Sequence, residues 1–144
     1  MQKADRQIAF VCTGNTCRSP MAEAIFNKLA EEKGLPVRAS SFGMAAANGV
    51  PVSALSVKAC EEIGVDLTGK KASFIYNFNI DQFERFYCMS AEHANMLMQF
   101  CGVPEELISV MNIPDPFGGS LDAYRACREE IVQVVEEIIK DYEN

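Results

Sequence analysis

The chain has 144 residues, of which 49% are hydrophobic and 23% charged; this is an ordinary globular composition and excludes a disordered polymer. One domain over 1–144 is expected, and the formal charge of -7 argues against partners such as nucleic acid or an acidic membrane. No apolar run has the length of a membrane span, and residues 1–6 lack the apolar core of a signal peptide, so we expect a cytoplasmic protein.

Strands and helices are predicted to alternate along the chain. Short apolar runs predict strands over 7–11, 37–42, 83–89 and 107–111. Apolar residues at helical spacing predict helices over 19–33, 53–63, 90–100 and 121–142. Residues 66–79 show no clean period and predict an irregular connection. Such alternation is typical of a parallel sheet covered by helices on both faces, in which ligands bind beyond the carboxyl ends of the strands.

The loop after the first predicted strand has the pattern Cys-x5-Arg-Ser-Pro, beginning at Cys12. Pro20 suits the first position of a helix, where its missing amide has no partner to lose. We expect the amides of 13–18 to curl around one point beside the positive helix end and form an anion cradle. Cys12 would then have a lowered pKa and act as a nucleophile, and Arg18 could hold two phosphoryl oxygens. The alternative is a buried thiol beside a surface cation.

The other loop residues are expected to support this cradle. Gly14 and Asn15 suit positive φ angles, and Asn15 is expected to brace the loop through its side chain. Ser19 is expected both to cap the helix and to donate to the Cys12 thiolate, and capping alone is the alternative. Cys17 could pair with Cys12 under oxidation or simply pack, and both interpretations stay open.

Cysteine and histidine usage limits the chemistry further. The lack of a secretory signal and of a Cys-x-x-Cys pair favours free thiols over a disulfide framework. The cysteines are Cys12, Cys17, Cys60, Cys88, Cys101 and Cys127. A single histidine, His93, rules out most zinc hydrolase sites, so no metal and no cofactor is expected. His93 itself is interpreted as a structural or surface residue, because nothing near it in sequence completes a catalytic pair.

Two segments together resemble a known family. The run from Cys12 to Glu23 is similar to the signature of the low-molecular-weight protein tyrosine phosphatases, and 115–119 (Asp-Pro-Phe-Gly-Gly) is similar to their general-acid loop. The resemblance spans essentially the whole chain. It implies an α/β fold: a three-layer α/β/α sandwich with a four-stranded parallel sheet in the flavodoxin-like order 2-1-3-4. It also implies hydrolysis of phosphotyrosine in a protein or peptide, with inorganic phosphate as a product.

The resemblance assigns roles to individual residues. Cys12 would form a phosphocysteine, Arg18 would clamp the phosphate, and Asp115 would act as general acid and then general base. The phosphate-binding residues would be those of the loop: Thr13, Gly14, Asn15, Thr16, Cys17, Arg18 and Ser19. Thr13 and Phe117 would line the substrate pocket, where Phe117 could stack on an aromatic leaving group.

Some residues depart from most tyrosine-directed members, namely Thr13, Phe117 and the segment 89–93 (Met-Ser-Ala-Glu-His). They resemble the protein arginine phosphatase branch, since Thr13 could offer a hydroxyl to a guanidinium nitrogen. We place phosphotyrosine first and phosphoarginine second. Arsenate reduction ranks lower because it needs two further neighbouring cysteines, for which Cys88 and Cys101 are the candidates. A non-catalytic phosphate-binding module also ranks lower, because it would need neither thiolate nor acid.

Overall fold

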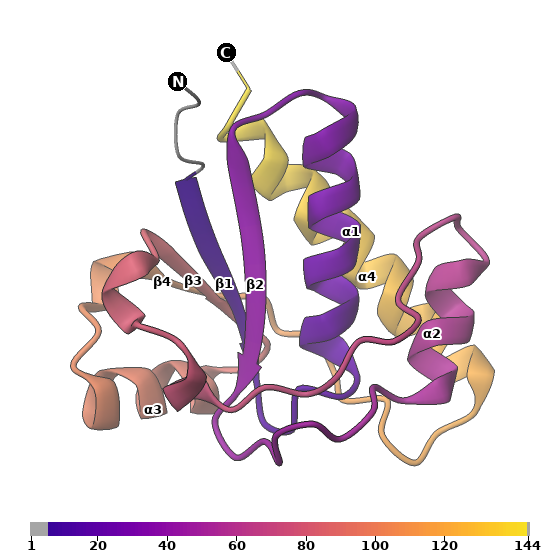
Figure 1. The fold of residues 1–144 in the computed structure, drawn as a ribbon, viewed down its shortest axis with the longest axis horizontal. Coiled ribbons are helices and arrows are strands. Elements are labelled where there is room, and N and C mark those ends of the chain that lie inside the picture. Colours follow the sequence, from indigo (N-terminus) through magenta and orange to yellow (C-terminus); the bar gives the residue numbers. More distant parts are fainter. Residues whose placement is uncertain (1–5, 144) are drawn as a thin grey trace.

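The computed structural model describes residues 6–143, in which four parallel strands alternate with four α-helices (Figure 1). In chain order these are β1 (Arg6–Cys12), α1 (Arg18–Glu32), β2 (Val37–Gly43), α2 (Ala54–Glu61), β3 (Arg85–Cys88), α3 (Ala91–Cys101), β4 (Ile108–Val110) and α4 (Leu121–Lys140). Short 3-10 turns occur at Ile75–Asn77, Ile80–Gln82 and Glu105–Leu107. Each predicted strand and helix is present, with ends within two residues of those expected.

The sheet has the order β2-β1-β3-β4 with every neighbouring pair parallel, which confirms the topology that the family resemblance implied. The carboxyl ends of β1, β2 and β3 lie level with one another. Val11 of β1 lies opposite both Phe42 of β2 and Cys88 of β3, and Cys12 lies opposite Gly43. The loops that follow these strands therefore meet at one end of the sheet, at the bottom of Figure 1.

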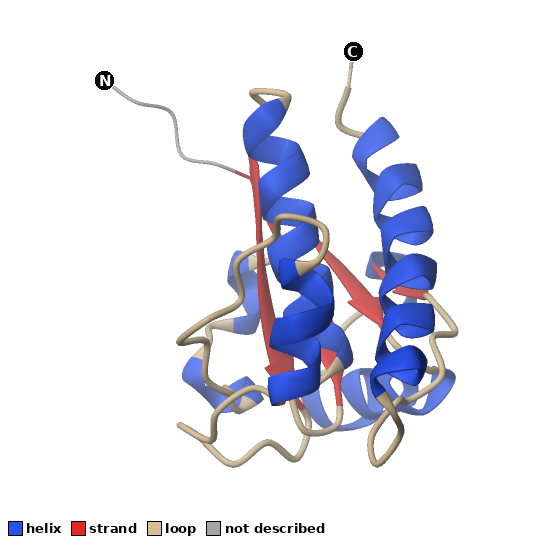
Figure 2. Ribbon diagram, turned by 90° about the vertical axis from the view of Figure 1, so that its right-hand side faces the viewer, coloured by secondary structure: helices blue, strands red, loops and turns tan. Residues whose placement is uncertain are grey.

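Both faces of the sheet are covered, as the apolar character of β1 requires. Ile8 and Phe10 face one cluster of buried side chains, which includes residues of α1, α2 and α4. Ala9 and Val11 face a second cluster, which includes residues of α3 and of the 3-10 turns. The result is a three-layer α/β/α sandwich: in Figure 1 the sheet lies between α3 on the left and α1 on the right, and in Figure 2 the side with α1 and α2 faces the viewer. The predicted stripe of α4 faces the first cluster: Tyr124, Cys127, Ile131, Val135 and Ile138.

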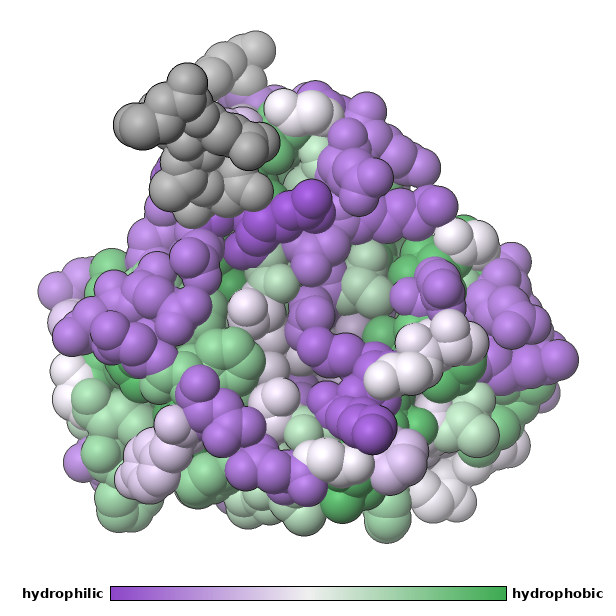
Figure 3. Space-filling model, viewed as in Figure 1, coloured by the Kyte–Doolittle hydropathy of each residue, from purple (hydrophilic) through white to green (hydrophobic). Residues whose placement is uncertain are grey.

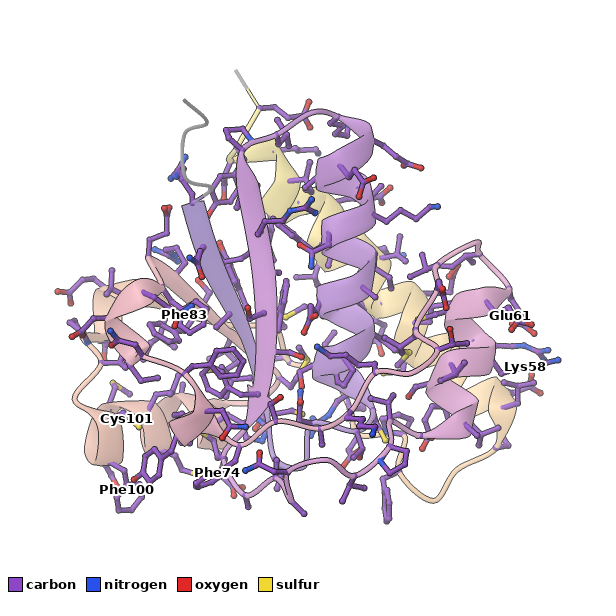
Figure 4. All side chains as sticks on the ribbon, viewed as in Figure 1. Lys58, Glu61, Phe74, Phe83, Phe100 and Cys101 are labelled. Atoms are coloured by element: carbon purple, nitrogen blue, oxygen red, sulfur yellow. The ribbon has the colours of Figure 1, made fainter. Side chains whose placement is uncertain are left out.

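The outer surfaces on the two sides of the sheet also differ. Hydrophilic side chains cover α1, whereas hydrophobic ones gather around α3 at the lower left of Figure 3. Lys58 and Glu61 project from α2, and the 70% exposed Phe100 projects from α3 (Figure 4). Within residues 6–143, no helix combines the length and apolar character needed to cross a bilayer.

The start of α1 differs in detail from the prediction. The helix begins at Arg18 with Cys17 as its N-cap, so Pro20 is the third helical residue rather than the first. Its missing amide still falls within the first turn, where no main-chain acceptor inside the helix exists. Ser19 also lies inside the helix, so it does not cap it and its hydroxyl is free for another partner.

Candidate active site

A pocket of about 210 Å³ lies where β1 runs into α1. Its lining residues come from two distant parts of the chain and include Cys12, Arg18 and Asp115. The remaining lining residues are Thr13, Gly14, Asn15, Thr16, Cys17 and Phe117. The structure thus brings together the catalytic and pocket residues expected from the sequence. Ser19 alone among the expected phosphate-binding residues lies behind the lining, where it is fully buried.

The main chain of the loop is held from its outer side. Met44 and Ala45 donate from their amides to the carbonyls of Cys12 and Thr13, each at 2.9 Å. The amide of Asn15 points inward and lies 3.2 Å from Cys12 Sγ. The carbonyls of Cys12 and Thr13 are thus turned outward and the amide of Asn15 inward, an orientation that suits a phosphate cradle.

The sulfur of Cys12 is buried and hydrogen-bonded. Its Sγ lies 2.7 Å from Ser19 Oγ, and the residue is only 3% exposed. Burial raises the pKa of the Cys12 thiol above its ordinary value, whereas hydrogen bonds to Ser19 and Asn15 and the charge of Arg18 lower it. Ser19, the amide of Asn15 and Arg18 each lower the pKa of Cys12, which is the direction predicted for the loop. The predicted net lowering of the pKa is wrong, because burial is the larger influence.

The direction of the Ser19 hydrogen bond follows from the side-chain amide of Asn15. Asn15 Oδ1 accepts from the amide of Ser73 at 2.8 Å, which identifies the other end of the side chain as the Nδ2 donor. Nδ2 donates to Ser19 Oγ at 2.8 Å and to Ser41 Oγ at 3.0 Å. Because Ser19 Oγ already accepts from Asn15, its own proton is available for Cys12 Sγ. This arrangement stabilises the thiolate over the thiol.

A carboxylate completes the network on the side away from Cys12. Ser41 donates to Glu23 Oε1 at 2.6 Å, and Lys70 donates to Glu23 Oε2 at 2.8 Å. Donation therefore runs from Asn15 through Ser41 to the Glu23 carboxylate, which accepts from Lys70 as well. Ser41 came from no motif in the sequence analysis, and its contact with Asn15 spans 26 residues.

Arg18 and Asp115 are linked across the pocket. Arg18 Nη1 donates to the carbonyl of Ile113 at 2.9 Å, and Arg18 Nη2 lies 3.7 Å from Asp115 Oδ2. The Arg18 side chain is 8% exposed, whereas that of Asp115 is 53% exposed and accessible to substrate and water. Asp115 Oδ1 accepts from the amide of Phe117 at 3.0 Å, which holds the carboxyl group over its own turn. Phe117 also lines the pocket and is 78% exposed, and its predicted role as a wall for the substrate stays a prediction.

His93 reaches the cradle, which the sequence interpretation missed. Its Nε2 lies 2.8 Å from Thr13 Oγ1, although the two residues are 80 positions apart. His93 is buried in α3, and burial together with the charge of Arg18 lowers its pKa. The interpretation of His93 as a surface residue is wrong, and its interpretation as a structural residue stays a prediction. The departure from the family pattern at 89–93 is the signal that could have identified it.

The shape of the cradle depends on the backbone of Asn15 and on the absence of a side chain at Gly43. Of the two loop residues that tolerate a positive φ, Asn15 adopts one, at 56°, and Gly14 does not. Gly43 is the glycine that the cradle requires. A Cβ at Gly43 would overlap the carbonyl oxygen of Thr13 and lie 3.0 Å from the amide nitrogen of Asn15. Only a residue without a side chain lets β2 pass this close beneath the loop.

The cysteines are all free in the described chain. Cys12 and Cys17 line the pocket, whereas Cys88 and Cys101 do not. Cys17 Sγ lies 3.4 Å from the hydroxyl of Tyr124, which packs the loop against α4. Burial raises the pKa of Cys88 to about 12. Both candidates for an arsenate-reducing relay lie outside the pocket lining and belong to or pack against the buried cluster on the α3 side of the sheet, which disfavours that reaction.

Comparisons with known proteins agree with this geometry. A family model for the low molecular weight phosphotyrosine protein phosphatases matches residues 7–143. A protein-arginine-phosphatase of Geobacillus stearothermophilus is 33% identical over 142 residues, covering 92% of this chain and 93% of that protein. The low molecular weight protein-tyrosine-phosphatase PtpB of Staphylococcus haemolyticus is 32% identical over 137 residues, covering 90% and 94%. The crystal structure of a low molecular weight protein tyrosine phosphatase from T. tengcongensis has a TM-score of 0.90 at 29% identity, covering 95% and 99%. The chain belongs to the low molecular weight phosphotyrosine protein phosphatase family, a family of cysteine-dependent phosphatases.

Proposed function

We propose that this chain hydrolyses phosphotyrosine in proteins or peptides through a phosphocysteine on Cys12. The observation that carries the proposal is the convergence of three groups on one pocket. They are the sulfur of Cys12, the guanidinium of Arg18 and the carboxyl group of Asp115. A pocket that only bound phosphate would have no use for a sulfur with a hydroxyl donor 2.7 Å away.

The first step transfers the phosphoryl group to sulfur. The thiolate of Cys12 attacks phosphorus while the bond from phosphorus to the leaving oxygen breaks, and protonated Asp115 gives its proton to that oxygen. Arg18 and the loop amides hold the phosphoryl oxygens as their charge redistributes. The exposure of Asp115 at the pocket entrance supports this role, because the leaving group must lie on that side.

The second step releases phosphate. Asp115, now a carboxylate, takes a proton from a water molecule as that water attacks phosphorus and the bond from sulfur to phosphorus breaks. The products are inorganic phosphate and the Cys12 thiolate. The proton of Ser19 stabilises the departing sulfur through the hydrogen bond at 2.7 Å.

The substrate supplies the base that ionises Cys12. Because burial raises the pKa of this thiol, we assign its proton to the dianionic phosphoryl group as the substrate enters, which leaves a thiolate and a monoanion. The acidic limb of kcat/KM should then follow the second ionisation of the substrate, near pH 6 for phosphate monoesters. Two substrates with different second pKa values should give displaced limbs, and coincident limbs would contradict the assignment.

Phosphoarginine is the second candidate substrate, because of a specific feature of the pocket wall. The hydroxyl of Thr13 lies in that wall and is hydrogen-bonded to His93 at 2.8 Å. A hydroxyl oxygen can accept from a guanidino N–H but gains nothing from a phenyl ring. The name of the Geobacillus stearothermophilus relative is consistent with this alternative.

We also place this enzyme in the cytoplasm, acting on phosphorylated protein without nucleic acid or membrane partners. Its free cysteines support a reducing compartment, and its charge of -7 supports the absence of nucleic acid or acidic membrane partners.

Phosphate release from p-nitrophenyl phosphate tests the catalytic assignment. Cys12→Ser should abolish turnover while keeping the binding of inorganic phosphate, measured by calorimetry, because the loop amides and Arg18 remain. Ser56→Ala removes another fully buried hydroxyl, on α2, and serves as a control for folding. Turnover by Cys12→Ser would refute the phosphocysteine mechanism. Phosphotyrosine and phosphoarginine peptides of one sequence, supplied in competition, then rank the two substrates.

A further inference from the structure

The wall of the pocket beside Thr13 is built by a residue that the mechanism does not use. His93 lies on α3, on the opposite face of the sheet from α1, and is 3% exposed. Because β1 and β3 are neighbours, the start of α3 lies beside the loop that follows β1. His93 is the residue through which that second helix layer contacts Thr13.

The hydrogen bonds of His93 have a defined direction. The amide of Ser90 donates to His93 Nδ1 at 3.2 Å, so Nδ1 carries a lone pair. The hydroxyl of Ser90 also lies 3.0 Å from Nδ1. In a neutral imidazole the proton is therefore on Nε2, which donates to Thr13 Oγ1 at 2.8 Å. The hydroxyl of Thr13 keeps one lone pair and its own proton for other partners.

The hydrogen bond from His93 decides whether the hydroxyl or the methyl group of Thr13 forms the pocket wall. A threonine side chain can exchange its hydroxyl and methyl group by rotation about χ1. The donor on His93 holds the hydroxyl in one rotamer, whereas an unheld side chain could turn its methyl group to the pocket. A methyl wall suits a phenyl ring, and a hydroxyl wall suits a leaving group with N–H donors.

We propose that His93 is a positioning residue that fixes the Thr13 hydroxyl in the pocket wall and thereby raises activity on guanidino leaving groups, those of the second candidate substrate, relative to activity on phenols. This inference rests on the proposed phosphatase function and deepens its substrate choice. Charged groups near the imidazole are Arg18 from α1, Glu92 from α3 and Asp115 from the acid loop.

Two substitutions separate the contact with Thr13 from the contact with Ser90. Asparagine at 93 places an acceptor near the position of Nδ1 but does not extend to Thr13. Glutamine extends an N–H donor toward the position of Nε2. The measured quantity is the ratio of kcat/KM for a phosphoarginine peptide to that for a phosphotyrosine peptide of the same sequence.

His93→Asn should lower this ratio about fivefold, the factor for a hydrogen bond worth about 1 kcal/mol, and His93→Gln should restore it to within about twofold. In a Thr13→Val background, His93→Asn should leave the ratio unchanged, because the hydroxyl is gone. The proposal would be overturned if His93→Asn and His93→Gln lowered the ratio equally. It would also be overturned if His93→Asn still lowered the ratio in the Thr13→Val background. A wild-type chain that releases phosphate from neither peptide would overturn the proposed function as well.

A second measurement does not depend on turnover. His93 is the only histidine in the sequence, so imidazole nitrogen resonances in NMR spectra report on it alone. We expect the Nε2–H tautomer at neutral pH, with an Nε2–H signal that shifts in Thr13→Val. A proton on Nδ1, or an Nε2–H signal unchanged by Thr13→Val, would overturn the proposal even if both peptides are substrates.

Discussion

Replacing Ser19 with alanine should raise the pKa of Cys12 and slow the breakdown of the phosphocysteine. Ser19 is fully buried and its hydroxyl lies 2.7 Å from Cys12 Sγ, so water cannot readily replace the lost donor. A hydrogen bond to a charged group contributes about 1.5–3 kcal/mol. At 1.36 kcal/mol per pKa unit, the pKa of Cys12 should rise by about one to two units. Loss of the same stabilisation from the departing thiolate should slow dephosphorylation by about 10- to 150-fold.

Two assays measure these effects. The pH dependence of Cys12 alkylation, located by peptide mass mapping, reports the pKa of the thiol. Rapid mixing with p-nitrophenyl phosphate separates the two chemical steps, and Ser19→Ala should give a burst of nitrophenol followed by a slow steady state. Ser56→Ala is the matched control, since its hydroxyl is equally buried but bonds to the carbonyl of Cys17 rather than to Cys12. An unchanged alkylation profile in Ser19→Ala would refute the donor role of Ser19.

Three further outcomes follow from the geometry. Asp115→Asn should slow hydrolysis most for leaving groups of high pKa, since these need the proton; equal slowing across a series of aryl phosphates would remove Asp115 from the acid role. Gly43→Ala should cost about 1–3 kcal/mol in urea unfolding and reduce phosphate release, because its Cβ overlaps the main chain of the cradle; wild-type activity would contradict this. The pKa of His93 is lowered in the folded state, so the unfolded chain binds the extra proton first and stability should fall as the pH drops below about 6.5. Urea unfolding from pH 7.5 to 5.5 should show this loss in the wild type and less of it in His93→Gln.

The parts of the site that the sequence predicts are those encoded locally. The cradle is one continuous loop between a strand and a helix, and its pattern from Cys12 to Arg18 fixes which residues share it. Asp115 is distant in sequence, but its flanking prolines and its similarity to a known loop identify it. The strand order follows from the family resemblance, because alternation alone predicts a parallel sheet without ordering its strands.

The parts that the sequence does not predict depend on tertiary contacts between side chains of ordinary type. Ser41, Lys70 and His93 join the site across separations of 26, 47 and 80 residues along the chain. A serine in a strand or a lysine in a loop has no local pattern that indicates such a role. No local pattern indicates the role of Gly43 either, because this role depends on the carbonyl of Thr13, which lies over it in the folded chain.

The ionisation of Cys12 shows why a list of neighbours is not enough to predict chemistry. The motif names the groups that favour a thiolate, and each is present: the hydroxyl of Ser19, the amide of Asn15 and the guanidinium of Arg18. Removal of the sulfur from water raises the pKa of Cys12 and opposes the combined effect of these groups. The size of this opposing effect depends on how tightly α1 and the loop close around the sulfur. Burial therefore favours the thiol and the donors favour the thiolate, so a group that accepts the proton on entering the pocket shifts the balance toward the thiolate. A dianionic phosphoryl group is such an acceptor, so burial of the sulfur links its activation to the arrival of the substrate.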